Sequence, residues 1–355
     1  MRIPLCKPEV NEEMKKAVIE TLEKDRFVLG ENVKKFEEEF ANYIGTKYAV
    51  AVSSGTAALQ IALQSLELEK NEKVVTSSNS FISTANAILF ANYLPCFADI
   101  YEDDGTIDVK TVKEEKAKVV LPVHIYGRVC NMDEIFSFFP DAVIVEDACQ
   151  AHGAKYKNRK AGSLGEIGCF SFYSSKNMTV CGDGGMITTN NEKIAEIAKS
   201  LRDCGRKSKY VHDRLGGNYR LNSINASIGR VQLKYLDEWN EKRRKVAKIY
   251  RELLPENILI PEKDYSYDVY HLFVVKLKKR DYIAAYLDKN GIETGVHYPI
   301  PIHLQPIYKK LFGYKKGVLP KTERFSKMIL SLPIYPSMKD EEVKFVCEKL
   351  LKVLR

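Results

Sequence analysis

The chain has 355 residues, of which 45% are hydrophobic and 29% charged, and its formal net charge at pH 7 is +8. This balance is typical of a soluble globular protein of about two domains and excludes a disordered or fibrous one. No segment approaches the ~18 uninterrupted apolar residues of a membrane span, and the N-terminus lacks the apolar core of a signal peptide, so we expect a cytoplasmic protein without a membrane partner.

The cysteines and the basic residues point to no metal site and no nucleic-acid partner. Eight cysteines are scattered without metal-type spacing to histidine, which favours reduced, structural thiols. The densest basic run, EKRRKVAK at 241–248, has the spacing of a solvated helix face and no interleaved aromatic residues. Such a run is better suited to holding an anionic substrate than to binding nucleic acid.

The first segments predict two helices and then a strand that leads into a third helix. Residues 9–24 and 31–44 repeat apolar residues at helical spacing. The β-like run 48–52 meets Ser53, Ser54, Gly55 and Thr56 and passes directly into a helix rich in alanine and leucine. A helix start with glycine and hydroxyl groups can bind phosphate, although serine or threonine at this position is more often only an N-cap.

Short apolar runs then alternate with helical segments along the chain. They predict strands buried on both faces of a mainly parallel sheet, which places the chain in the α/β class. Ligands of such sheets bind beyond the carboxyl ends of the strands, where Asp147, Lys176, His124 and Tyr126 fall. The expected strands are 74–78, 96–100, 119–127, 142–148, 169–175 and 185–190.

The pattern changes in the last third of the chain. From Leu215 a glycine-rich turn leads into one long helical stretch that ends before Pro255 and that we interpret as the connection between domains. The residues beyond it predict a smaller α+β domain with a closing helix at 341–354. We therefore expect a large domain over 1–238 and a C-terminal domain over 239–355.

Lys176 stands out because aromatic and apolar residues precede it and a glycine-rich turn, Gly182 to Gly185, follows it. Apolar surroundings disfavour the ammonium form, so the amine can act as a nucleophile toward a carbonyl. Asp147 leaves a buried strand and needs a cationic or donor partner. Taken alone, Lys176 can equally be an ordinary loop lysine and Asp147 a helix-capping acid.

Taken together, these features are what pyridoxal phosphate requires: a phosphate cradle, an acid for the ring nitrogen and a lysine for the aldehyde, here 29 residues after the acid. With their flanking residues they resemble the DegT/DnrJ/EryC1/StrS family of sugar aminotransferases over nearly the whole chain. The resemblance implies the aspartate-aminotransferase fold, with a mainly parallel, seven-stranded-type sheet. The matching runs include AVSSGTAAL, VEDACQAHGA, SFYSSKN, GDGGMITT, NYRLNSINASIG and HYPIPIHLQPIY.

The resemblance also implies a role for each candidate residue. Lys176 would bind the cofactor as a Schiff base and transfer the proton, and Asp147 would pair with the pyridinium nitrogen. The other cofactor-binding residues would be Gln150 near the phenolic oxygen, Gly55, Thr56 and Ser171 at the phosphate, Phe81 stacked on the ring unless it is a core residue, and Asn218 supplied by the neighbouring subunit. The last implies a homodimer with shared active sites. Tyr298 and His303 would meet the sugar nucleotide.

The resulting hypothesis is transfer of an amino group from L-glutamate to a keto-sugar nucleotide, with C3 slightly favoured over C4, in amino-sugar and surface polysaccharide biosynthesis. A non-catalytic regulatory or nucleic-acid-binding protein on the same fold is one alternative. A sugar dehydratase dependent on pyridoxal phosphate is another. The dehydratase of the family carries histidine in place of the lysine, so Lys176 favours transamination.

Overall fold

The computed structural model describes residues 2–112 and 116–354, and its centre is a seven-stranded sheet. The order is β1-β9-β8-β5-β4-β2-β3; β9 runs antiparallel to β1 and β8, and the remaining pairs are parallel. The expected α/β class and mainly parallel sheet are thus confirmed. The strands are β1 Tyr48–Val52, β2 Lys73–Ser77, β3 Leu94–Ala98, β4 Val119–Leu121, β5 Val143–Asp147, β8 Ile167–Ser171 and β9 Gly185–Thr189.

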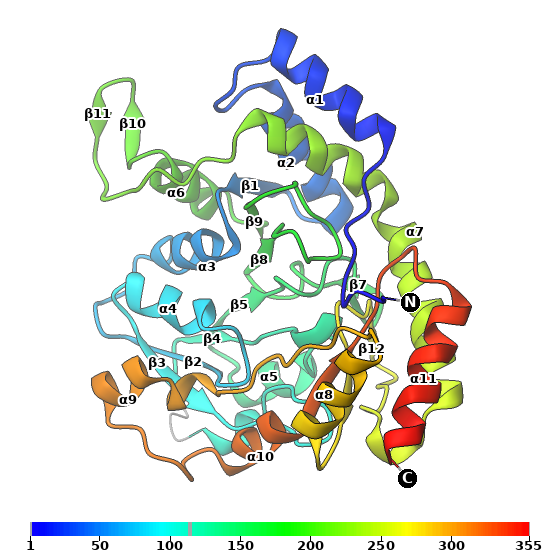
Figure 1. Cartoon of the computed structure of the whole chain (residues 1–355). Coiled ribbons are helices and arrows are strands. Elements are labelled where there is room, and N and C mark those ends of the chain that lie inside the picture. Colours follow the sequence, from blue (N-terminus) through cyan, green and yellow to red (C-terminus); the bar gives the residue numbers. More distant parts are fainter. Residues whose placement is uncertain (1, 113–115, 355) are drawn as a thin grey trace.

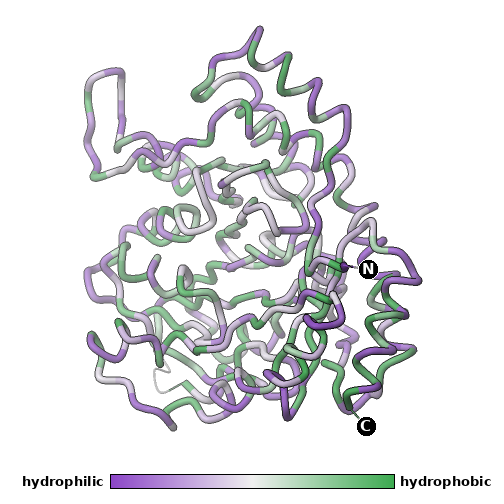
Figure 2. The backbone as a smooth tube through the Cα atoms, in the orientation of Figure 1, coloured by the Kyte–Doolittle hydropathy of each residue, from purple (hydrophilic) through white to green (hydrophobic). Residues whose placement is uncertain are grey.

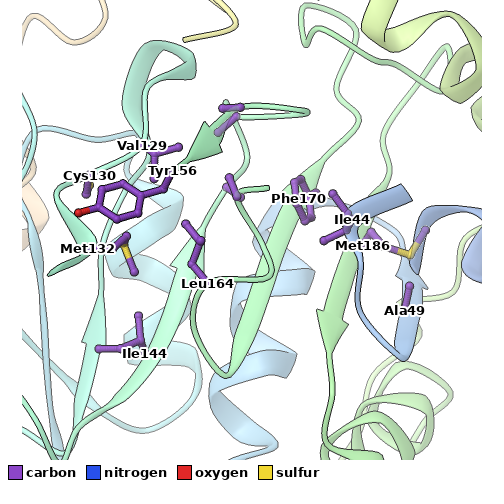
Figure 3. Packing of buried hydrophobic residues seen from close by; sticks show 14 of the residues in the cluster. Ile44, Ala49, Val129, Cys130, Met132, Ile144, Tyr156, Leu164, Phe170 and Met186 are labelled. Atoms are coloured by element: carbon purple, nitrogen blue, oxygen red, sulfur yellow. The ribbon is translucent and has the colours of Figure 1, made fainter. Parts of the chain in front are cut away.

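Helices cover both faces of this sheet (Figure 1). On one face, α3 (Gly55–Gln64), α4 (Ser83–Phe90) and α6 (Glu192–Arg202) share one buried cluster with the strands. On the other face, α2 (Glu31–Ile44), α5 (Met132–Phe138) and α7 (Ser223–Leu253) share a second. Figure 3 shows part of the second cluster, where Ile44, Phe170 and Met186 lie together. The two layers explain why the strands read as continuous apolar runs.

Several predicted boundaries differ from the structure. The strands expected at 96–100 and 169–175 lie at Leu94–Ala98 and Ile167–Ser171. The first helix, α1, spans Glu12–Lys24 and starts later than expected because the Asn11 side chain accepts a hydrogen bond from the Met14 N–H (3.0 Å). The strand expected at 119–127 ends at Leu121, because Pro122 lacks an N–H for the ladder and Tyr126 then turns with φ of 63°.

The C-terminal part has its own buried cluster, built on the antiparallel pair β13 (Phe273–Lys276) and β14 (Ile329–Leu332). Ile3 belongs to this cluster, so the start of the chain packs against its end. The helices here are α8 Arg280–Lys289, α9 Pro306–Phe312, α10 Pro320–Met328 and α11 Asp340–Leu354. Figure 2 shows hydrophilic and hydrophobic residues alternating along α1 and α11, as helices with one buried face require.

The long helix α7 joins the two parts of the chain. One residue of its basic run departs from the predicted solvated face: Arg243 is buried, and its Nη1 donates to the carbonyl of Ile334 (3.0 Å). Short strands form two further small sheets, β12-β6-β7 and the hairpin β10–β11, and the hairpin projects away from the body (Figure 1). Their bounds are β6 Lys155–Tyr156, β7 Arg159–Lys160, β10 Arg206–Ser208, β11 Val211–His212 and β12 Ser266–Tyr267.

Within residues 2–112 and 116–354, no helix is both long and apolar enough to cross a membrane.

A buried carboxylate holds the loop between β5 and β8. Glu146 is fully buried and accepts hydrogen bonds from the backbone N–H groups of Gly162, Leu164 and Gly165, each at 2.7 Å. Its Oε2 also accepts from the Nε2–H of His124 (2.9 Å). His124, expected at the ligand-binding edge, therefore has a structural position inside the protein.

We expect Glu146→Gln to lower the free energy of unfolding by about 2–4 kcal/mol, because an amide carries no charge and cannot accept from all four donors. Urea unfolding followed by circular dichroism measures the change, with the exposed Glu192→Gln as the control. Equal midpoints for the two variants would show that the Glu146 network does not stabilise the fold.

Candidate active site

A cavity of about 480 Å³ opens beyond the carboxyl ends of β5 and β8, at the start of α3 and α4. The start of the chain and the C-terminal part close its other side. The residues that line it are Leu5, Cys6, Ser54, Gly55, Thr56, Leu59, Ser80, Phe81, Ser83, Thr84, Asp147, Cys149, Gln150, Ser171, Tyr173, Ser175, Lys176, Asp183, His271, Leu272, His297 and Tyr298. Most of the predicted site residues therefore meet in one cavity.

Lys176 lies in a tight loop that follows β8. Its backbone N–H donates to the carbonyl of Tyr173 (2.9 Å), and the carbonyl of Phe172 accepts from the Thr179 hydroxyl (3.0 Å). Burial lowers the pKa of the Lys176 ammonium, and nearby Cys149 and Asp147 offset only part of this effect. The lowered pKa increases the fraction of neutral, nucleophilic amine at neutral pH.

Asp147 is the last residue of β5, and its carboxylate is buried in the cavity floor. Its Oδ2 accepts a hydrogen bond from the Thr84 hydroxyl (2.7 Å), and its Oδ1 accepts from the Cys149 N–H (3.2 Å). The Thr84 hydroxyl is in turn 2.7 Å from that of Ser80. These contacts fix the orientation of the carboxylate, although they cannot neutralise it.

The start of α3 has the open backbone and hydroxyl groups of the phosphate cradle that the sequence predicts. The Ser54 side chain caps the helix by accepting from the Ala57 N–H (3.1 Å), and the Thr56 hydroxyl donates to Ser83 (2.8 Å) at the start of α4. The first N–H groups of a helix have no carbonyl partners within it and attract anions. A Cβ on Gly55 would lie 2.7 Å from the Cβ of Ser171, so only glycine leaves the cradle open.

We expect Gly55→Ala to weaken binding of pyridoxal phosphate by about tenfold or more, because the added methyl must push Ser171 away or fill the cradle. Fluorescence titration of the protein with the cofactor measures the affinity, and Gln64→Ala at the far end of α3 is the control. An unchanged affinity would mean that the phosphate binds elsewhere.

Aromatic residues and an amide close the cavity around the expected ring. Phe81 is 53% exposed, so it is not a core residue, and its ring centre lies 5.7 Å from that of Tyr298. The Gln150 amide donates to the Tyr298 hydroxyl (3.3 Å) and accepts from the Tyr126 N–H (2.8 Å). Tyr126 itself lies behind this wall, where its hydroxyl donates to the His297 carbonyl (2.7 Å).

Two predicted site residues lie outside the cavity lining. His303 is fully buried, with its ring between Ser78 (2.7 Å) and Glu323 (3.2 Å), a position that supports the loop rather than faces the cavity. Asn218 is exposed near the β10–β11 hairpin. Its expected role concerns the cavity of a neighbouring subunit and stays a prediction.

Sequence reasoning missed several lining residues, among them Leu5, Thr84, His271 and His297. Burial and the charge of Lys176 lower the pKa of His297 to about 4, and the same causes lower that of His271 well below its ordinary value, so both rings are neutral at pH 7. His297 lies within the run HYPIPIHLQPIY, so the sequence could have indicated it as a site residue. Leu5 reaches the site only through tertiary packing, in which its carbonyl accepts a hydrogen bond from the Ile334 N–H (3.1 Å).

The donor set fits pyridoxal phosphate. An amine with a lowered pKa, an oriented buried carboxylate and an open helix N-terminus supply the contacts that its aldehyde, ring nitrogen and phosphate need. The sheet and this site define the class of the protein: an enzyme of the aminotransferase fold that depends on pyridoxal phosphate. The chain belongs to the DegT/DnrJ/EryC1/StrS aminotransferase family, whose sequence profile matches residues 8–351. Members of this family are nucleotide-sugar aminotransferases.

Relatives share this sequence over almost their full length. The chain is 39% identical to a pleiotropic regulatory protein of Geobacillus stearothermophilus, with 98% of this chain and 96% of the relative covered. It is 37% identical to the dTDP-3-amino-3,4,6-trideoxy-alpha-D-glucose transaminase of Streptomyces venezuelae, with 93% and 89% covered.

Solved structures share the fold. DesV of S. venezuelae, solved in complex with a ketimine intermediate, superposes with a TM-score of 0.95 at 34% identity, covering 99% of this chain and 98% of that one. The sugar aminotransferase Spr1654 of Streptococcus pneumoniae, described as putative, superposes in its pyridoxal phosphate form with a TM-score of 0.92 at 26% identity, covering 99% and 98%. The expected aminotransferase fold is therefore confirmed.

Proposed function

We propose that this protein binds pyridoxal phosphate and transfers an amino group from L-glutamate to a keto-sugar nucleotide, with C3 as the acceptor carbon. The observation that carries the proposal is the meeting of Lys176, Asp147 and the open start of α3 in one cavity. Membership of a nucleotide-sugar aminotransferase family supports the substrate class.

Most of the predicted site residues that line the cavity have a defined task in this proposal. Pyridoxal phosphate, when bound, supplies an aldehyde that exchanges amines and a ring that withdraws electrons from the substrate carbon. Asp147, oriented by Thr84 and Cys149, keeps a proton on the ring nitrogen. Gly55, Thr56 and Ser171 hold the phosphate; Gln150 and Phe81 hold the ring.

Lys176 has two tasks, to bind the aldehyde and to move the proton at the substrate carbon. Its lowered pKa leaves the amine neutral for a larger fraction of the time, so it can accept that proton. The neutral rings of His271 and His297 add no positive charge beside it, which keeps the amine in its basic form.

The choice of C3 rests on two observations. The run HYPIPIHLQPIY and the turn Gly182 to Gly185 resemble members of the family that act at C3. The S. venezuelae relative, 37% identical, is named for a 3-amino sugar. Glutamate is proposed as the donor on the family resemblance alone.

We also propose a cytoplasmic homodimer that serves amino-sugar and surface polysaccharide synthesis. Asn218 is exposed and lies outside the cavity of its own chain, which suits a residue that completes the cavity of a partner. We keep the proposed domains at 1–238 and 239–355, with the N-terminal segment packed on the second.

The test is a screen of the protein loaded with pyridoxal phosphate. Addition of L-glutamate should shift the cofactor absorbance to the amine form. Of the 3-keto and 4-keto sugar nucleotides then offered in turn, the 3-keto acceptor should restore it. NMR of the product assigns the carbon that carries nitrogen. A product aminated at C4 would correct the position, and an unchanged spectrum with glutamate would reject this donor.

A regulatory protein that binds nucleic acid is the second candidate, because a 39% identical relative bears the name pleiotropic regulatory protein. This candidate predicts an affinity for DNA that falls steeply as the salt concentration rises and that does not require Lys176.

A dehydratase is distinguished from both other candidates by mass spectrometry, since its product gains no nitrogen. The cavity favours transamination over the other two.

A further inference from the structure

One carboxylate of the cavity has no structural task. Asp183 lies in the turn before β9, is exposed and lines the cavity, and makes no hydrogen bond or ion pair with any residue in 2–112 or 116–354. The turn is held by other groups: Phe172 N–H donates to the Gly184 carbonyl (2.8 Å), and Cys181 N–H donates to the Thr179 hydroxyl (3.1 Å). The carboxylate is therefore free to meet either water or a ligand that enters the cavity.

The charge of the cavity limits what that ligand group can be. Lys176 is the only lysine or arginine that the described residues contribute to the lining, and Asp147 already faces it across the floor. A second carboxylate therefore repels the carboxylates of glutamate and the diphosphate of a nucleotide. A carboxylate only accepts hydrogen bonds, and the neutral donors of a nucleotide sugar are its hydroxyl groups.

We propose that Asp183 accepts hydrogen bonds from hydroxyl groups of the substrate sugar and so determines that a sugar, rather than a nucleoside diphosphate alone, is bound. Two carboxylate oxygens can accept from two neighbouring hydroxyls at once, and a charged acceptor strengthens each bond. Tyr173 and Ser175 of the preceding loop also line the cavity and offer further contacts. The inference rests on the proposed function, because it assigns one group of the proposed substrate.

The experiment compares sugar nucleotides with their nucleoside diphosphates. Isothermal titration of the protein loaded with pyridoxal phosphate gives the affinities for dTDP-glucose, UDP-glucose and GDP-glucose and for dTDP, UDP and GDP. Asp183→Asn and Asp183→Ala should weaken binding of the sugar nucleotide with the highest affinity by about 10- to 100-fold, as loss of a charged hydrogen bond does. The affinity for the matching diphosphate should stay the same or increase, because the variants also remove a charge that repels it. Asp288→Asn, an exposed acid on α8, is the control.

Two results would overturn the inference: the Asp183 variants lose affinity equally for the sugar nucleotide and its diphosphate, or they lose affinity for neither. A parent protein that binds no sugar nucleotide more tightly than its diphosphate would also overturn it. The absorbance change with glutamate is recorded on the same samples and should persist in both Asp183 variants. Its absence from the parent protein would instead indicate failure of the proposed donor reaction.

Discussion

Replacement of Lys176 by alanine is expected to lower turnover by roughly 10⁴-fold or more, because one amine both binds the cofactor aldehyde and moves the proton. The variant should still fold, since the half-buried side chain lines a cavity and its loop is held by backbone contacts and Thr179. Steady-state rates with glutamate and a keto-sugar nucleotide measure the loss. The absorbance band of the covalently held cofactor should vanish with it.

Lys199→Ala on α6 is the matched control, because it removes an exposed lysine that does not line the cavity. It should leave both the rate and the spectrum unchanged. A Lys176→Ala protein that transaminates at the parent rate would show that another amine binds the cofactor aldehyde and transfers the proton.

Asp147→Asn has the second largest expected effect, a loss of roughly 10²–10³-fold in turnover. The amide keeps the shape of the floor and can still meet Thr84 and Cys149, so some cofactor should remain bound. It carries no negative charge to hold a proton on the ring nitrogen, so proton removal from the substrate slows. Rapid-mixing absorbance with glutamate isolates this step from binding.

Asp141→Asn, an exposed acid just before β5, is the control for the loss of one charge on the same segment. It should behave like the parent protein. If the Asp147→Asn variant removes the substrate proton at the parent rate, then the carboxylate has a structural role only. Another group would then keep the ring nitrogen protonated.

The sheet could be predicted because its strands are buried on both faces and so read as unbroken apolar runs such as 142–148. Lys176, Asp147 and Gly55 could be predicted because each stands at the end of such a run or at the start of a helix, where local sequence alone determines position. The family resemblance implied a mainly parallel, seven-stranded-type sheet. The order and register of the strands could not be predicted, because they depend on pairing between segments far apart in the sequence.

The remaining lining residues depend on tertiary contacts that no local pattern reveals. Leu5 reaches the cavity because the start of the chain packs onto the C-terminal part, as the Ile334 hydrogen bond shows. Thr84 matters only because α4 turns its hydroxyl toward Asp147. His303 was expected to meet the sugar nucleotide because it lies in a loop that matches the family. In the structure its ring is buried and contacts Ser78 and Glu323.

The most direct measurement of the central claim is chemical mapping of the cofactor linkage. The protein is loaded with pyridoxal phosphate, reduced with borohydride, digested and analysed by tandem mass spectrometry. The added mass should fall on Lys176 alone, and Asp147→Asn should retain it there. A modification spread over surface lysines, or fixed on a different residue, would contradict the assignment of this cavity as the active site.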